Sequence, residues 1–294
     1  TQDGYVAINL ARAEDWSLLP AWLEESVEDW SQLAEHVARR TTMPLLERGR
    51  LMGLAVATPN EAITPSVADE LSDAQIKVSS APMVVDLSAL WAGPLCSHIL
   101  QQCGFRVVKV ESVQRPDGAR EGSPIHFNAL HQGKRLRRFD FADANDLQGL
   151  RELLASADVV IEGSRPRALR ALGLDRDSLM GGACSATSSQ LWLSLTAYGR
   201  PRPYGDWVGF GDDVAIAAGA YTLTNNKLPG FLGDAIADPL TGLMGALIVL
   251  HLRHWRVCGL VDLSLFRAVN FCVDWILDSG GVMASPTTYP ALRC

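Results

Sequence analysis

The sequence predicts an α/β protein in which a parallel sheet carries helices on both faces. Short apolar runs rich in β-branched residues recur from Met83 onwards, and segments of helical length separate them. This alternation is typical of parallel sheets, because each crossover between parallel strands returns through a helix. The first eighty residues follow a different pattern, which predicts a smaller α+β domain at the N-terminal end.

The N-terminal segment, residues 1–60, is expected to form this small domain. Its pattern predicts one short strand at 5–10 and three helices at 15–25, 29–40 and 44–52. Residues 61–82 contain Pro, Ser and Asp with little periodicity, which is typical of a linker. We therefore expect the large domain to occupy residues 83–294.

The large domain shows a regular succession of strand and helix patterns. Runs of β-branched residues, too short for helices, predict strands at 83–87, 106–110, 159–161, 191–196 and 260–263. Amphipathic or apolar segments predict helices at 93–103, 144–155, 213–220, 239–253 and 264–278. The sequence shows no internal repeat.

Composition and charge exclude several classes of function. The chain has 294 residues, with 26 Lys and Arg against 33 Asp and Glu and a net charge of −7. This balance argues against nucleic acid and anionic membranes as partners. The longest apolar run, 239–250, is too short to cross a bilayer. The six cysteines form no C-x-x-C pair, so we expect reduced thiols and a cytoplasmic protein.

Common cofactor and metal motifs are absent. The sequence lacks G-x-G-x-x-G, the P-loop and the G-x-S-x-G elbow, and its histidines lack metal-ligand spacing, so no metal is expected. The loop after the first large-domain strand, residues 86–94, leads into a helix and offers N–H groups to an anion. Glu111 closes the next strand, and we favour a solvated strand-end carboxylate over a ribose contact there.

A small basic cluster lies between the second and third of these predicted strands. Lys134, Arg135, Arg137 and Arg138 lie within five residues of sequence. A solvated loop is the default interpretation, and a contact to a phosphate-bearing cofactor is the alternative.

Asp238 is the strongest candidate for chemistry. It directly precedes Pro239 and an apolar helix, so a plain N-cap is one interpretation and is slightly favoured on the bare sequence. The other is a nucleophile, because the helix dipole and local N–H donors keep a carboxylate ionised at the start of a buried helix.

The chain resembles the family III CoA-transferases, the formyl-CoA and carnitine CoA-transferase type. The resemblance is carried in the family's order by VVDLSALWAGP (84–94), VVKVES (107–112), GKR within 131–141, ADVVIEGSRPRALRALGL (157–174), SLTAYG (194–199), ADPLTGL (237–243) and LVDLSLFRAV (260–269).

The resemblance implies a Rossmann-like large domain, a small domain and an interlocked homodimer. It implies that Asp238 is the nucleophile that passes through aspartyl anhydride and aspartyl-CoA thioester intermediates while CoA moves between an acyl-CoA and a carboxylic acid. Coenzyme A is thus a substrate, and no tightly bound cofactor is implied. The expected CoA contacts are Leu90, Trp91, Ala92, Gly163, Ser164, Arg165, Arg170, Lys134 and Arg135.

Several positions depart from the family pattern. Trp91 stands where the formyl-CoA enzymes have Gln, Gly163-Ser164 replaces Asn-Phe, and Ala171 replaces an Arg beside Arg170. The small-domain segment also precedes the large domain, which a longer parent protein with two transferase-like halves would explain.

Two alternatives remain. An α-methylacyl-CoA racemase needs an acid and a base on either side of the α-carbon, and the resembling racemases have His where this chain has Gly211. Either His126 or His131 would then have to supply that group. The other alternative is a non-catalytic CoA-binding subunit, which the altered contact positions suggest.

Overall fold

The computed structural model describes residues 1–63, 70–73, 80–180, 189–224 and 228–279. Contacts divide the chain into two compact units, each built from separate stretches of sequence. The first comprises Thr1–Pro65, Arg202–Ala237 and Leu265–Cys294, and the second comprises Ser66–Pro201 and Asp238–Ser264. The expected division into 1–60, 61–82 and 83–294 stays a prediction.

The first unit contains the predicted N-terminal helices. In chain order its elements are β1 (Ala7–Asn9), α1 (Ala13–Leu23), α2 (Trp30–Ala38), α3 (Thr42–Met52), β2 (Ala55–Ala57), the short helix η1 (Tyr204–Asp206), α10 (Gly211–Ala217), β9 (Thr222–Leu223), β10 (Pro229–Gly230) and α12 (Leu265–Asp278). Strands β1 and β2 pair antiparallel, with Ile8 opposite Val56. Trp22 is buried in the helical core, and its indole N–H donates to the carbonyl of Leu45 at 2.9 Å.

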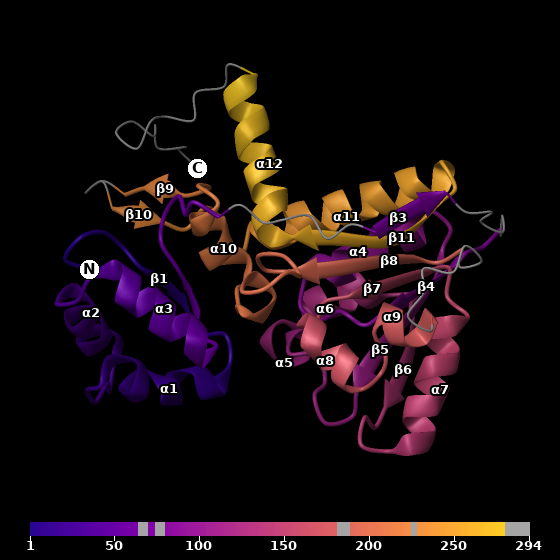
Figure 1. Cartoon of the computed structure of the whole chain (residues 1–294), viewed down its shortest axis with the longest axis horizontal. Helices are drawn as coiled ribbons and strands as arrows, with labels where there is room; N and C mark the ends of the chain where they lie inside the picture. The colour runs from indigo at the N-terminus through magenta and orange to yellow at the C-terminus, as the bar shows by residue number, and fades with distance from the viewer. Residues whose placement is uncertain (64–69, 74–79, 181–188, 225–227, 280–294) are drawn as a thin grey trace. The chain divides into compact units, whose positions relative to one another are not determined.

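The second unit is built on a seven-stranded sheet within the described residues (Figure 1). Its strands are β3 (Glu70–Asp73), β4 (Met83–Asp86), β5 (Arg106–Ser112), β6 (Arg135–Phe139), β7 (Val159–Glu162), β8 (Leu191–Thr196) and β11 (Val257–Ser264), in the spatial order β3-β11-β8-β7-β4-β5-β6. All pairs are parallel except β11 with β3. This is the order of a Rossmann-like doubly wound sheet, as expected from the resemblance.

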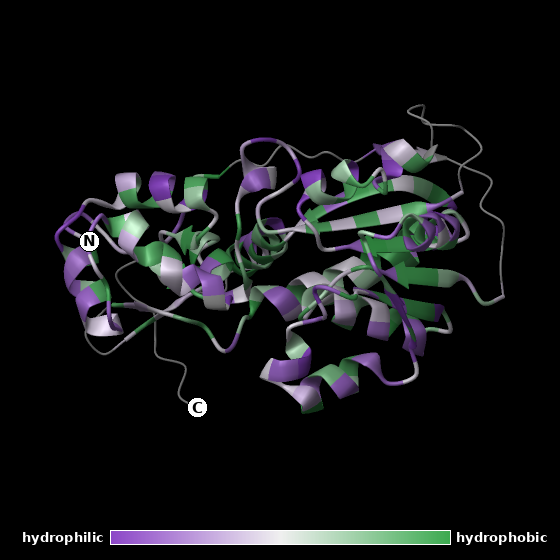
Figure 2. Cartoon of the chain, turned by 90° about the horizontal axis from the view of Figure 1, so that it is seen from below, coloured by the Kyte–Doolittle hydropathy of each residue, from purple (hydrophilic) through white to green (hydrophobic). Residues whose placement is uncertain are grey.

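Helices cover both faces of this sheet. They are α4 (Ala92–Gln102), α5 (Ala119–Gly122), α6 (Pro124–His131), α7 (Ala144–Ala155), α8 (Pro166–Ala171), α9 (Arg176–Met180) and α11 (Ala237–His254). Trp192 on β8 packs in one cluster with Leu150 and Leu154 of α7. The next residue, Leu193, faces Gly245 of α11 instead. Alternate residues of one strand therefore point to two helical layers, and the central strands β4, β7 and β8 are accordingly mostly hydrophobic and buried, as the green strands of the sheet in Figure 2 illustrate.

The sequence interpretation missed the strands at the edges of the sheet. β3 falls in the expected linker, and β6 falls on the basic cluster that we expected to be a solvated loop. An edge strand meets a neighbour on one side only, so charged side chains are tolerated there and the hydrophobic signal is weak. Glu111 was also misjudged, because its side chain is 2% exposed and pairs with Arg120 at 2.8 Å.

No helix in the described ranges is both long and apolar enough to span a membrane. Cys96, Cys103, Cys258 and Cys272 are free thiols, whereas Cys184 and Cys294 lie outside the described residues.

Candidate active site

The candidate site lies where the direction of strand order reverses. β4 and β7 are neighbours in the sheet, and the chain proceeds from them toward opposite edges. In such sheets the loops at the carboxyl ends of these two strands diverge and leave a crevice for ligands. The loop after β4 carries Leu90, Trp91 and Ala92, and the loop after β7 carries Gly163, Ser164 and Arg165. The two groups of predicted CoA contacts therefore follow the two central strands.

Glycines allow these loops to approach each other. A Cβ placed on Gly163 would lie 3.3 Å from the Cβ of Ser88, and one placed on Gly93 would lie 2.0 Å from the Ser88 Oγ. The first distance is tight and the second is impossible. The replacement of the family's Asn by Gly163 thus accompanies close packing against Ser88.

Asp238 faces the N-terminus of α4. The backbone N–H of Ala92, the first residue of α4, points at Asp238 Oδ1 over 3.4 Å, a long hydrogen bond. Helix α11 begins at Ala237, so Asp238 lies in its first turn and not at the cap position immediately before it. Pro239 follows in the same turn and is tolerated there, because the first four N–H groups of a helix have no partner within the helix.

Asp238 therefore lies in the first turn of one helix and opposite the first turn of another. The unpaired N–H groups of a helix N-terminus carry partial positive charge, which favours an ionised carboxylate. Asp238 is half-buried, whereas Asp234, in the turn before α11, is exposed. The described contact with the α4 N-terminus is made by Asp238 and not by Asp234.

A buried ionic network fixes the start of α4. Asp86, fully buried at the end of β4, accepts hydrogen bonds from Ser88 and from the Ser97 hydroxyl. Burial acts to raise the pKa of this carboxyl. The ammonium groups of Lys109 and Lys134 and the serine hydroxyls outweigh burial, so the pKa is lowered and the carboxylate stays charged.

Lys134 ties the first turn of α4 to this carboxylate. Its Nζ donates to the Pro94 carbonyl at 2.8 Å and to the Ser97 Oγ at 2.7 Å, and it lies 3.7 Å from Asp86 Oδ2. Burial lowers the pKa of Lys134 to about 8, and the Asp86 charge opposes that change. The lysine side chain is 1% exposed, so it supports the helix from inside.

A second buried pair holds the other end of the same loop. Lys109 Nζ donates to the Ser88 carbonyl and lies 3.2 Å from Asp117 Oδ2. Asp117 Oδ1 accepts the Leu90 N–H at 3.0 Å. The loop that leads into α4, with the Ala92 N–H at its end, is thus anchored on both sides. The sequence reasoning did not single out Lys109 or Asp117, although a lysine inside the apolar run VVKV was an available signal.

The predicted arginines of the CoA site are exposed. Arg135 lies on β6, and Arg165 lies at the N-cap of α8. Arg170 lies at the end of α8, with its Nε 3.6 Å from an Asp175 carboxylate oxygen. Arg165 and Arg170 therefore belong to the helix that follows the central strand β7, whereas Arg135 begins the edge strand β6. Lys134 differs from all three because it is buried.

The two histidines considered for a racemase both lie on α6. His126 packs edge-on against Trp91 at 4.9 Å between ring centroids. His131, at the other end of the helix, contacts Phe127. Of the two, His126 is therefore the one in contact with the loop that precedes α4.

Comparison with known proteins gives these residues a context. A family model described as CoA-transferase family III matches residues 82–280. An acyl-CoA transferase of Fusarium pseudograminearum is 32% identical over 205 residues, covering 63% of this chain and 44% of that protein. A succinyl-CoA–D-citramalate CoA-transferase of Chloroflexus aurantiacus is 27% identical over 199 residues, covering 63% of this chain and 48% of that protein.

A solved structure agrees with these sequence matches. The crystal structure of a CaiB/BaiF family protein from Brucella suis superposes with a TM-score of 0.59 at 27% identity, covering 71% of this chain and 59% of that one. The chain spans about half the length of the curated relatives it matches. The family model covers more than half of the chain, including both central loops and Asp238, and the chain therefore belongs to family III of the CoA-transferases.

Proposed function

We propose that this chain carries out CoA transfer between an acyl-CoA and a carboxylic acid, with Asp238 as the nucleophile. The observation that carries the proposal is the contact between the Ala92 N–H and Asp238 Oδ1 at the switch point of the sheet. This contact orients the Asp238 carboxylate toward the first turn of α4. The first turns of α4 and α11 both favour the charged form that attack requires.

The reaction then proceeds by exchange of acyl bonds on this carboxylate. Asp238 attacks the thioester carbonyl carbon, a C–O bond forms, the C–S bond breaks, and CoA leaves as a thiolate. The thiolate attacks the aspartyl carbonyl of the anhydride, which releases the donor acid as a carboxylate and leaves an aspartyl-CoA thioester. The acceptor carboxylate attacks the aspartyl carbonyl of this thioester, the C–S bond breaks, and CoA thiolate leaves behind a second anhydride. The thiolate then attacks the acceptor acyl carbon of that anhydride, which forms the new acyl-CoA and releases the Asp238 carboxylate.

CoA in this proposal lies over the ends of β4 and β7. Arg165, exposed at the N-cap of α8, gives charge-assisted hydrogen bonds to a phosphate, and Leu90, with 41% of its surface exposed, offers an apolar contact. Succinyl-CoA is the donor we would use first, because a relative is named for its transfer to a dicarboxylic acid.

We further propose that the chain acts as a homodimer. Leu243 and Leu247, one turn apart on α11, are 55% and 67% exposed. Phe271 and Trp275, one turn apart on α12, are 62% and 65% exposed. Large apolar side chains repeated at helical spacing favour burial by a second subunit. Light scattering that shows only monomer at micromolar concentration would refute this.

Trapping with hydroxylamine tests the mechanism directly. The full chain is incubated with succinyl-CoA and hydroxylamine, and peptides are searched by mass spectrometry for an aspartyl hydroxamate. We expect the hydroxamate on Asp238, its loss in Asp238→Asn and its retention in Asp234→Asn, since Asn keeps the size of Asp and removes the carboxylate nucleophile. Bound CoA without any hydroxamate would favour a non-catalytic subunit, and α-proton exchange of a branched acyl-CoA without hydroxamate would favour a racemase.

A further inference from the structure

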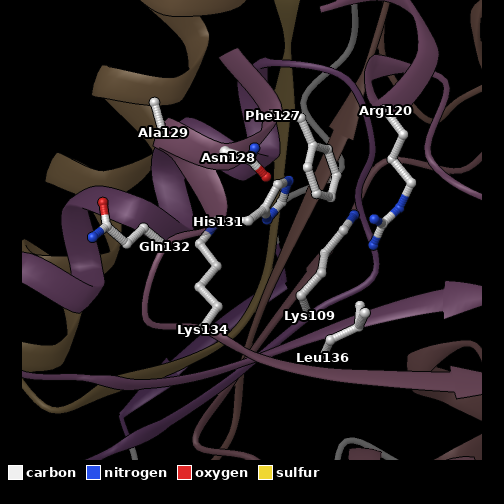
Figure 3. Close-up of a pocket in the computed structure, with 9 residues that line it drawn as sticks. All are labelled: Lys109, Arg120, Phe127, Asn128, Ala129, His131, Gln132, Lys134 and Leu136. Atoms are coloured by element: carbon white, nitrogen blue, oxygen red, sulfur yellow. The ribbon is translucent and has the colours of Figure 1, made fainter. Parts of the chain in front are cut away.

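A cavity lies beside the loop that leads into α4. It has a volume of about 470 Å³ and lies between β5, β6, α5 and α6; its lining residues include Lys109, Arg120, Phe127, His131 and Lys134. In Figure 3 the side chains of Phe127, His131, Lys109 and Arg120 converge on one space. This size falls within the range of small-molecule sites.

Side chains in the cavity wall keep N–H donors that their contacts with other residues do not use. Lys109 donates one of its three N–H bonds to the Ser88 carbonyl, and its ammonium lies 3.2 Å from Asp117 Oδ2 as an ion pair. Within the described residues, Arg120 uses Nε and Nη2 for Glu111, which leaves Nη1 for a ligand. The guanidinium is fixed over the Phe127 ring, 4.2 Å from its centroid.

His131 contributes a buried imidazole ring to the cavity wall. Its side chain is 8% exposed, and neither ring nitrogen has a hydrogen-bond partner in the described part of the chain. Its nearest acid, Asp117, lies 3.9 Å away, beyond hydrogen-bond distance. Burial, together with the charges of Lys134 and Lys109, lowers the pKa of His131 to about 4, so the ring is neutral near pH 7. Buried polar groups without partners are costly and rare in folded proteins.

The charge of the cavity favours a monovalent anion. Lys109, Lys134 and Arg120 belong to its wall, whereas the acids that pair with them, Asp117, Asp86 and Glu111, do not. The wall therefore presents cations, but each cation is already balanced by an acid behind it. Burying the second charge of a phosphate dianion there would be costly, whereas a carboxylate brings a single charge and two acceptor oxygens that the unused donors can meet.

We propose that this cavity binds a carboxylate group, with Lys109 and Arg120 donating to its oxygens and the His131 ring donating the third hydrogen bond. A chain of contacts connects the cavity wall with Asp238. His126 of α6 contacts Trp91, and the next residue, Ala92, points its N–H at Asp238. The identity of the ligand rests on the proposed function: it is the free carboxylate of a dicarboxylic donor or acceptor.

Binding is measured without CoA, so that no reaction takes place. Glutarate is titrated into the full chain while the ¹⁵N signals of the histidine rings are followed by NMR, and the His131 signals are assigned by their loss in His131→Phe. We expect glutarate to shift the His131 signals and glutaramide, its uncharged analogue, to leave them unchanged. Inorganic phosphate or adenosine 3′,5′-bisphosphate shifting them more strongly than glutarate would overturn the proposal, because the cavity would then be a phosphate site.

Variants separate binding from folding. His131→Phe removes two unpaired nitrogens at similar size, so it should be at least as stable to urea as the wild type and yet bind glutarate about tenfold more weakly in calorimetry, which does not depend on the His131 signals. Arg120→Gln should also weaken binding, and Arg115→Gln, which changes an exposed arginine in the loop before α5 and outside the cavity, should not. Unchanged glutarate affinity in His131→Phe would refute the proposal. Asp238→Asn should bind glutarate normally, so a failed trapping experiment and a failed binding experiment remain distinguishable.

Discussion

The approach of α11 to α4 can be tested at Gly242, one helical turn after Asp238. A Cβ added at Gly242 would lie 2.7 Å from the Ala92 carbonyl oxygen and 3.0 Å from the Leu95 Cβ. Both atoms belong to the start of α4, and neither can rotate away as a flexible side-chain end can. Gly242→Ala must therefore push the two helices apart at the point where Asp238 meets the Ala92 N–H.

Two effects of opposite sign set the magnitude. Alanine is favoured over glycine inside a helix by about 1 kcal/mol. Overpacking costs about 1–3 kcal/mol, and a backbone contact lies in the upper part of that range. We therefore expect Gly242→Ala to lower the free energy of unfolding by about 1–2 kcal/mol.

Two other helical glycines provide a graded control. At Gly245 the nearest atoms are the ends of the Leu193 and Cys96 side chains, at 3.1 and 3.3 Å, which can shift, so the two effects should nearly cancel. At Gly149 in α7 the Phe139 ring at 3.6 Å is an ordinary contact, so Gly149→Ala should stabilise by up to about 1 kcal/mol.

Urea unfolding with an unchanged m-value measures the three free energies, and the hydroxamate yield at Asp238 measures the effect on the site. The expected order of stability is Gly149→Ala, then Gly245→Ala, then Gly242→Ala, with a reduced yield only for Gly242→Ala. A Gly242→Ala protein as stable as Gly149→Ala and fully active in trapping would refute the close helix approach.

Three further predictions concern charged groups. Arg165→Ala should weaken CoA binding about tenfold in calorimetry, and Arg167→Ala, exposed nearby, should have little effect; equal losses would contradict the placement of CoA. Arg200 pairs with Glu162, whose side chain is 2% exposed and whose pKa is raised by burial. In urea unfolding, Arg200→Leu should therefore lower the free energy of unfolding by about 3–5 kcal/mol, and Glu162→Gln should lower it clearly less. The pKa of His131 falls from 6.5 to about 4 on folding, so between these values the unfolded chain binds the extra proton and stability is lost as pH falls. Between pH 6.5 and 4, the free energy of unfolding of His131→Phe should fall by about 1–2 kcal/mol less than that of the wild type, once solvent screening is allowed for. Parallel plots of unfolding free energy against pH for the two proteins would contradict this.

The local sequence pattern was sufficient to predict the elements inside the sheet and the position of Asp238 at the start of a helix. Helix α7 at Ala144–Ala155 and strand β8 at Leu191–Thr196 have the bounds expected from the sequence, because a buried strand or an amphipathic helix repeats its hydrophobic signal within a few residues. The position of Asp238 at the start of an apolar helix is likewise a property of adjacent residues. Its role as nucleophile stays a prediction.

Tertiary structure decided which charges meet. Lys109 and Asp117, Asp86 and Lys134, and Glu162 and Arg200 come from separate strands, helices and loops. The apolar run VVKV indicates that Lys109 is buried, but no local pattern shows which acid a buried lysine will meet. The same holds for β3 and β6, whose polar edge sequences become strands only when β11 and β5 offer their backbone groups. Such features depend on partners distant in the chain, because hydrogen bonds and ion pairs form between atoms that folding, and not sequence proximity, brings together.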